Sequence, residues 1–177
     1  MDKQIMNWEI VGIVVISLLG SLFHSLFDWT GKLLPLAIFL PVNESVWEHL
    51  KLTYTPALIY FVIEYKYLKD ELKNFLIAKA LFFTVAPFTI MGGFYLHKLL
   101  TEGSNLLFDI LLYFAAIAVG QVVSYKILNT EELSKNWNIL GLVVIICWGV
   151  LYALFTFWVP YLPPFYDTSK GLYGIPP

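Results

Sequence analysis

Apolar residues occur along this chain in five long runs, separated by short segments that carry charged and polar residues. An α-helix needs about 20 predominantly apolar residues to cross the hydrocarbon core of a bilayer, and each run is close to that length. The pattern therefore predicts an all-α bundle of five transmembrane helices, at residues 10–27, 50–65, 75–96, 106–125 and 139–159.

A sixth apolar stretch, residues 33–42, is too short to span a bilayer. It contains Pro35 and Pro41, which interrupt a regular helix. Irregular backbone at membrane depth is tolerated only where protein or a wet cavity satisfies its polar groups. We therefore predict a re-entrant or interfacial loop that lines a cavity.

The C-terminal tail, residues 160–177, is rich in proline and aromatic residues, whereas a solvated tail is normally polar. We expect it to fold back and cap the outer end of the bundle. The alternative is an interfacial tail anchored by its aromatic side chains. No compositional break separates two domains, so residues 1–177 are treated as a single transmembrane domain.

Composition supports the membrane assignment, because 59% of the 177 residues are hydrophobic and only 14% are charged. A soluble domain carries about 25% charged residues, so lipid must cover the excess apolar surface. The net charge of −2 and the absence of arginine argue against a nucleic-acid partner. The sequence leaves the oligomeric state open.

Lysine placement predicts the orientation of the bundle. With five spans, seven lysines fall on the side of the N-terminus and four on the other side. This excess favours a cytoplasmic N-terminus and a C-terminus outside.

The same five-span arrangement places all three histidines, His24, His49 and His97, at the outer face. Carboxylates fall at that face too: Asp28, Glu44, Glu48, Asp109 and Asp167. Imidazole and carboxylate together suit zinc or another divalent ion, and three protein ligands plus one water would form a hydrolytic site. We therefore predict a metal held by the three histidines, with Glu48, Glu44 and Asp109 as catalytic candidates.

Structural roles compete with this reading. The segment from Ser45 to Glu48 matches the capping box S/T-x-x-E, so the alternative role of Glu48 is only to start a helix. His24 and His97 also suit hydrogen-bonded or interfacial positions. Neither an HExxH motif nor a Cys-x-x-Cys pair occurs in the sequence.

A second polar set, Glu64, Gln121, Ser124 and Tyr125, falls towards the cytoplasmic side. Glu64 is close to Lys66 in sequence, so the simplest expectation is an ion pair that reaches the interface. If these groups instead faced the same cavity as the outer cluster, a polar path across the bilayer would favour transport.

Residues 41–51, with the sequence PVNESVWEHLK, and the ending PPFYD followed by GLYGI resemble a family of small, uncharacterised prokaryotic membrane proteins. The resemblance covers nearly the whole chain. It implies a multi-pass protein of a bacterial or archaeal cell membrane, and it implies no activity.

The predicted chemistry is also similar to that of membrane hydrolases of the alkaline ceramidase and adiponectin-receptor type. Those proteins hold zinc with three histidines near one membrane face, beside an Asp and a Ser. This chain departs from them in lacking a paired H-x-x-x-H and in having five spans rather than seven, so the similarity is one of chemistry and not of kinship.

Three functions remain open from the sequence. The first is a metal-dependent hydrolase with its site at the outer face, acting on a lipid-like substrate. The second is a small-solute transporter or the substrate-binding subunit of one. The third is a non-catalytic assembly or sensing protein in which the polar groups only cap helices and fix their packing.

Overall fold

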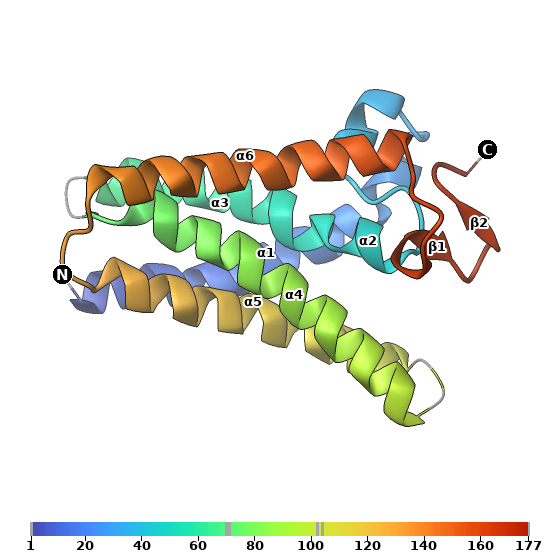
Figure 1. Cartoon of the computed structure of the whole chain (residues 1–177), viewed down its shortest axis with the longest axis horizontal. Coiled ribbons are helices and arrows are strands. Elements are labelled where there is room, and N and C mark those ends of the chain that lie inside the picture. Colours follow the sequence, from blue (N-terminus) through green and yellow to red (C-terminus); the bar gives the residue numbers. More distant parts are fainter. Residues whose placement is uncertain (1, 70–71, 102, 104, 177) are drawn as a thin grey trace.

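The helices follow the apolar runs of the sequence and lie side by side as one bundle (Figure 1). The computed structural model describes residues 2–69, 72–101, 103 and 105–176. In that part of the chain the long helices are α1 (Asp2–Trp29), α3 (Lys51–Leu68), α4 (Phe75–Thr101), α5 (Leu106–Leu128) and α6 (Lys135–Phe157).

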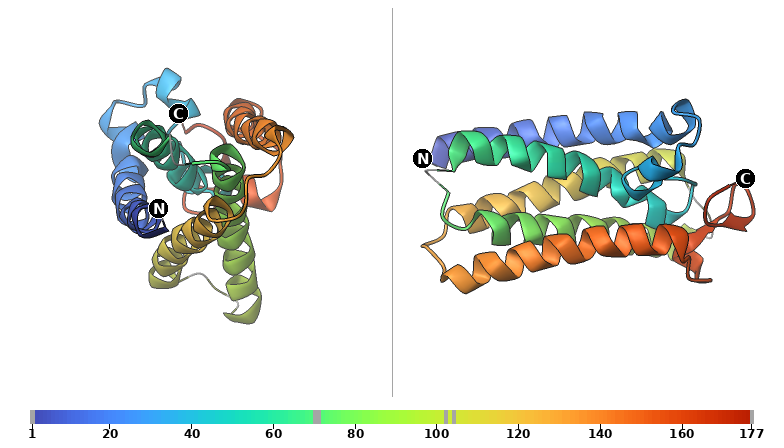
Figure 2. Two further views of the ribbon diagram at one scale, coloured as in Figure 1. Left: turned by 90° about the vertical axis from the view of Figure 1, so that its left-hand side faces the viewer. Right: turned by 90° about the horizontal axis from the view of Figure 1, so that it is seen from above.

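Successive long helices run in opposite directions, so the two termini lie at opposite ends of the bundle (Figures 1 and 2). Helix α1 packs against α3 and α5, while α4 packs against α5 and α6. Seen end-on, α1 and α6 lie on opposite sides of the bundle (Figure 2). The end that carries the C-terminal residues is called the tail end below.

Within the described residues, four of the five long helices are long and apolar enough to cross a membrane: Lys3–Trp29 within α1, and α4, α5 and α6. Four apolar helices of this length are compatible with a multi-pass membrane protein, and they overlap four of the predicted spans. The largest difference from the predicted limits is in α1, which begins at Asp2 rather than at residue 10 and whose early turns bury Glu9 inside the bundle.

The remaining predicted span corresponds to α3, which is not among these four candidates. It carries Lys51, Glu64 and Lys66, which lower its hydropathy. Lys51 and Glu64 are buried against protein, so α3 places polar groups in the interior of the bundle.

The predicted re-entrant loop forms a short 3₁₀ turn, η1 (Leu34–Ile38), at the tail end. It packs beside α6, and Ala37 and Leu40 are buried against Phe27 and Val42. The neighbouring Leu33 and Leu34 are exposed, so only one face of the segment is covered by protein. Insertion of this loop into the membrane stays a prediction.

The C-terminal tail folds back at this end of the bundle. It forms η2 (Pro163–Phe165) and a hairpin of β1 (Tyr166–Asp167) and β2 (Leu172–Tyr173), in which Tyr166 pairs with Tyr173. Phe165 packs on Trp47 in a tilted arrangement, with ring centroids 4.9 Å apart. The tail therefore covers the short helix α2 (Val46–His49), which precedes α3.

Helices α4 and α6 approach so closely at Gly141 that a side chain there has no room. A Cβ at this position would lie 2.5 Å from the backbone carbonyl of Leu76 and 2.6 Å from the Ile77 nitrogen. Backbone atoms cannot move aside as a flexible side chain does. We expect Gly141→Ala to destabilise the protein by about 1–3 kcal/mol, measured by thermal unfolding in detergent.

The matched control is Gly92→Ala in α4, where an added Cβ meets nothing within 4 Å. There the usual helix preference for alanine should leave stability unchanged or slightly raised. Equal melting temperatures for the two variants would contradict the close approach of α4 and α6.

Candidate metal centre

The loop before α2 determines where the site residues point. Ser45 is the N-cap of α2, and its hydroxyl accepts the Glu48 backbone N–H at 3.3 Å, which confirms the capping function predicted for it. In a capping box the Glu48 side chain would accept the Ser45 backbone N–H. Here that N–H donates to Asn43 Oδ1 instead, at 2.8 Å. Asn43 also donates to the Gly174 carbonyl at 2.8 Å, which ties the loop to the tail.

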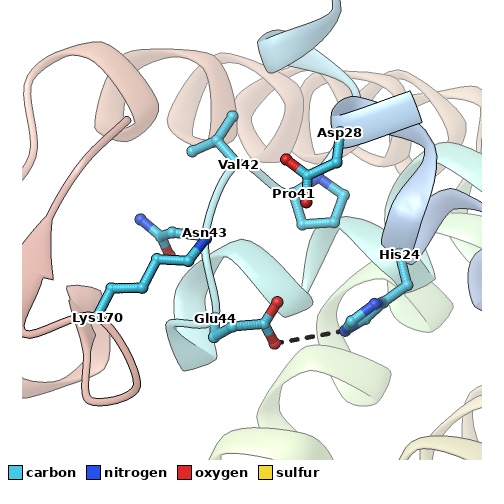
Figure 3. Close-up of a pocket in the computed structure, with 7 residues that line it drawn as sticks. All are labelled: His24, Asp28, Pro41, Val42, Asn43, Glu44 and Lys170. Atoms are coloured by element: carbon cyan, nitrogen blue, oxygen red, sulfur yellow. Dashed lines mark ion pairs between the residues drawn. The ribbon is translucent and has the colours of Figure 1, made fainter. Parts of the chain in front are cut away.

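Three side chains from different elements meet beside this loop: His24 from α1, Glu44 from the loop and His49 from α2. The Nε2 atoms of the two histidines lie 3.1 Å apart. Glu44 Oε2 lies 3.5 Å from His24 Nε2 and 3.4 Å from His49 Nε2. Figure 3 shows the Glu44 carboxylate pointing at the His24 ring, while Asp28, one turn further along α1, lies beside Pro41. The three groups are close enough to ligate one metal ion.

One hydrogen bond assigns the proton on the His49 ring. Its Nδ1 lies 2.9 Å from the Ser45 carbonyl oxygen, which can only accept, so Nδ1 carries the hydrogen. In the neutral ring the lone pair is then on Nε2, and it faces Glu44 and His24. His24 Nε2, 3.1 Å away, can donate a hydrogen bond to this lone pair, and a proton or a metal ion on His49 Nε2 would remove its repulsion with the Glu44 carboxylate.

The charges of the site respond to this arrangement. Hydrogen bonds from His24 and His49 lower the pKa of Glu44 well below its usual range. Burial favours the neutral form of His49, but the contacts with Glu44 and the Ser45 carbonyl outweigh it and raise its pKa above the ordinary value. The stabilisation from protonated His49 is therefore present at low pH and is lost as the pH rises through this raised pKa.

The cluster of His24, Glu44 and His49 opens on a cavity of about 550 Å³ between α1, α4, α5 and the tail. Figure 1 shows the last turns of α4 diverging from α6 on this side of the bundle. Apolar and aromatic side chains such as Phe94 and Ile110 line much of the cavity. Its wall therefore combines a polar cluster with an apolar surface.

Asp109 lines the same cavity from the first turn of α5. Its Oδ1 atom is buried and has no hydrogen-bond partner among the described residues. His97 and His49 are the ionisable groups that act on it electrostatically. Asp109 therefore combines a place in the cavity wall with an unsatisfied carboxylate oxygen.

The structure does not bring the other predicted site residues into the cluster. The His97 ring stacks on Phe108, with centroids 4.0 Å apart, and is not part of the three-residue group. Glu48 points to the opposite side of α2, where its carboxylate contacts Lys51 Nζ at 2.6 Å and Thr156 Oγ1 at 3.0 Å. Glu48 is buried, and it also accepts the Val42 N–H at 3.0 Å.

Two further residues contribute to the site: Tyr113, which the sequence did not point to, and Asp167, which was expected at this face but not as a ligand or catalytic residue. Tyr113 lines the cavity one turn after Asp109, on the same face of α5, so the i, i+4 spacing was the available signal. Asp167 Oδ2 accepts the Glu44 backbone N–H at 3.1 Å. Burial alone raises the pKa of Asp167, but hydrogen bonds from Ser169, Glu44 and Lys170 lower it, so the carboxylate stays charged.

We expect Asp167→Ala to weaken metal binding at the cluster by about tenfold, because the loop that carries Glu44 loses its anchor in the tail. Asp167→Asn keeps one carbonyl oxygen as a hydrogen-bond acceptor and should lose less zinc affinity than Asp167→Ala. The measurement is a zinc titration of detergent-purified protein against a chromophoric chelator. Unchanged zinc affinity in Asp167→Ala would show that the tail does not position Glu44.

The second polar set lies elsewhere. Glu64, Gln121 and Ser124 are fully buried, and none of them lines the cavity. Glu64 pairs with Lys79 at 2.7 Å, so the expected pairing with Lys66 is wrong. Lys79 lies in the interior, where it can reach Glu64 from the adjacent helix without leaving the bundle.

No curated protein and no solved structure is detectably similar to this chain. The sequence profile of a family of unknown function, DUF6512, matches residues 1–175. The match covers the loop, the short helix and the tail that build the cluster, as well as every long helix. The chain therefore belongs to the DUF6512 family.

Proposed function

We propose that this protein is a metal-dependent hydrolase embedded in the membrane, acting on a lipid-like substrate held in the 550 Å³ cavity. The metal, zinc or another divalent ion, is ligated by His24, Glu44 and His49. This replaces His97 of the sequence-based ligand set with Glu44. The observation that carries the proposal is the convergence of these three side chains at the wall of an amphiphilic cavity.

The spacing of the three ligand atoms supports a metal. Ligands about 2.0–2.1 Å from a tetrahedral zinc ion lie about 3.3 Å from one another. The distances of 3.1, 3.4 and 3.5 Å within the cluster bracket that value. Two histidines and one glutamate are a known catalytic zinc set that leaves a fourth position for water. The bond from His49 Nδ1 to the Ser45 carbonyl is the outer-shell contact that such a ligand usually makes.

The shape and lining of the cavity support an amphiphilic substrate. An acyl chain would pack on the apolar side chains between α4 and α5, and its polar head would face the cluster. Lys98 lies in the same wall and offers a positive charge to an anionic head group. Substrate in the bilayer would reach the site along the lipid-facing surface.

A divalent ion held by His24, Glu44 and His49 would acidify a bound water towards neutrality and polarise a carbonyl oxygen. Asp109, the unpartnered carboxylate of the cavity, accepts a proton from the attacking water. The water oxygen bonds to the carbonyl carbon, the C–O or C–N bond breaks, and Asp109 returns the proton to the leaving alcohol or amine. Of the three catalytic candidates, Asp109 rather than Glu48 is the general base, because Glu48 is engaged with Lys51 and Thr156.

We place the cluster at the outer face of a prokaryotic cell membrane, with the N-terminus in the cytoplasm. Lys79 and Lys51 are buried ion-pair partners and do not act as loop charges. Without them the lysine count still favours this orientation.

Transport is supported less well than hydrolysis. A transport path would join the cavity to Glu64, Gln121 and Ser124, and these residues do not line it. The separation of the two polar sets favours a site reached from one side only.

The test compares metal content and hydrolysis in the same preparations. Detergent-purified protein is loaded with zinc and assayed on a long-chain fluorogenic ester and the corresponding amide in mixed micelles. We expect zinc-dependent hydrolysis in the parent and in the control His97→Ala. The Asp109→Asn variant should bind zinc like the parent, and its rate of hydrolysis should be about 10²–10⁴-fold lower. Zinc-loaded protein that hydrolyses neither probe, or activity that survives without the three ligands, would overturn the proposal.

The pH dependence of zinc binding has a defined sign. A protonated imidazole cannot ligate a metal ion, so zinc must displace a proton from His49. The raised pKa of His49 means that this ring holds its proton up to a higher pH than usual. Zinc affinity should fall about tenfold per pH unit below that pKa and level off above it. Competition titrations across the pH range measure this, and a flat profile would exclude His49 as a ligand.

A further inference from the structure

A second cluster of charged side chains is buried in the bundle, away from the cavity. Glu9 of α1, Glu64 of α3, Lys79 of α4 and Ser124 of α5 are each at most 3% exposed. Charged groups inside a membrane bundle are costly and mark functional sites more often than other positions do. Each of four helices contributes one polar group here.

Lys79 is the centre of this cluster. Its Nζ lies 2.7 Å from Glu9 Oε1, 2.7 Å from Glu64 Oε2 and 3.1 Å from Ser124 Oγ. The Ser124 hydroxyl in turn donates to Glu9 Oε1 at 2.9 Å. The three ammonium hydrogens are therefore shared among Glu9, Glu64 and Ser124.

The charges of the cluster do not balance. Two carboxylates face one ammonium, and among the described residues no second cation pairs with Glu9 or Glu64. The nearby Tyr60 hydroxyl donates to the Trp8 carbonyl rather than to a carboxylate. A net negative charge at this depth would be strongly unfavourable, so one further positive charge is required.

Unpartnered polar atoms indicate where that charge lies. Among the residues that the structure describes, Glu9 Oε2 is buried without a hydrogen-bond partner, and so are both polar atoms of the Gln121 side chain. Gln121 is one turn from Ser124 on α5 and packs on α1 at Gly12, where an added Cβ would lie 1.9 Å from its Nε2. Gly12 in turn is one turn from Glu9. The Gln121 side-chain oxygen on α5 therefore lacks a donor, and the unpartnered Glu9 carboxylate oxygen lies one turn away on the face of α1 that Gln121 contacts.

We propose that this four-helix cluster is a proton-binding site, which holds one proton on the pair of Glu9 and Glu64 at neutral pH. The proton makes one carboxyl oxygen of the pair a donor and leaves one carboxylate to balance Lys79. The carboxylates belong to α1 and α3, whereas Lys79 and Ser124 belong to α4 and α5. Loss of the proton at higher pH therefore adds repulsion between α1 and α3, independently of the metal site.

Infrared spectroscopy of the full chain in detergent tests the proposal, because a protonated carboxyl group absorbs apart from a carboxylate. We expect the parent protein to show a protonated-carboxyl band at neutral pH. Either Glu9→Gln or Glu64→Gln should abolish that band, because one carboxylate then balances one ammonium. The matched control is Glu132→Gln, an exposed glutamate, which should leave the band unchanged.

Two outcomes would overturn the proposal. A band that persists in both variants and disappears in Asp109→Asn would assign the proton to the cavity. Absence of the band in the parent, together with a melting temperature that sodium raises in the parent but not in Glu9→Gln, would show that a sodium ion supplies the positive charge.

Discussion

Replacement of Lys79 by methionine is expected to destabilise the protein by about 3–5 kcal/mol, because it leaves two buried carboxylates without their cation. Glu64→Gln is expected to change stability far less, although it removes a group from the same cluster. It leaves one carboxylate opposite one ammonium, and the amide can still accept a hydrogen bond from Lys79 Nζ. The asymmetry follows from the excess of carboxylates over ammonium groups.

Thermal and denaturant unfolding in detergent measure both changes. Lys73→Met is the control, because Lys73 lies 3.8 Å from Glu132 in a solvent-exposed pair that contributes little. Equal loss of stability in Lys79→Met and Glu64→Gln would show that the cluster is balanced without an added proton.

Replacement of a ligand at the candidate metal centre is expected to have the second large effect. Loss of an outer-shell partner of a metal ligand reduces affinity about 10–100-fold, so loss of the ligand itself should exceed that range. We expect His49→Ala and Glu44→Gln each to weaken zinc binding by more than about 100-fold. His97→Ala should bind zinc like the parent, because its ring stacks on Phe108 outside the cluster.

Zinc competition titrations at neutral pH measure these affinities, and melting temperatures show whether each variant is folded. A large loss of zinc affinity in His97→Ala, with little change of affinity in Glu44→Gln, would support the three-histidine ligand set predicted from the sequence. Equal affinity in all variants would assign any bound zinc to another part of the protein.

Much of the site's location was predictable from the chain direction alone. Each long helix reverses the direction of the chain. Whether an odd or an even number of helices precedes a residue therefore decides the end of the bundle at which it lies. Five alternating helices place His24 and His49 at the same end of the bundle, and the structure brings their Nε2 atoms within 3.1 Å. The capping role of Ser45 was predictable too, because it depends on residues within one turn.

The choice between Glu44 and Glu48 was not predictable in this way. Both glutamates are within five residues of His49, and the direction of each depends on contacts with distant parts of the chain. Lys51 and Thr156 draw Glu48 towards α6, while Asp167 in the tail holds the Glu44 backbone beside His24. Lys79 similarly decides the pairing of Glu64, and it comes from a different helix.

The sequence by itself determined the helices and the grouping of polar residues at the two ends. Hydropathy is a property of each segment, and lipid leaves a helix as the simplest way to satisfy its backbone. Only the tertiary structure decided which polar groups meet, because a buried charge takes whichever partner the packed helices bring within reach. That choice separates the cluster of His24, Glu44 and His49 from the charged cluster around Lys79.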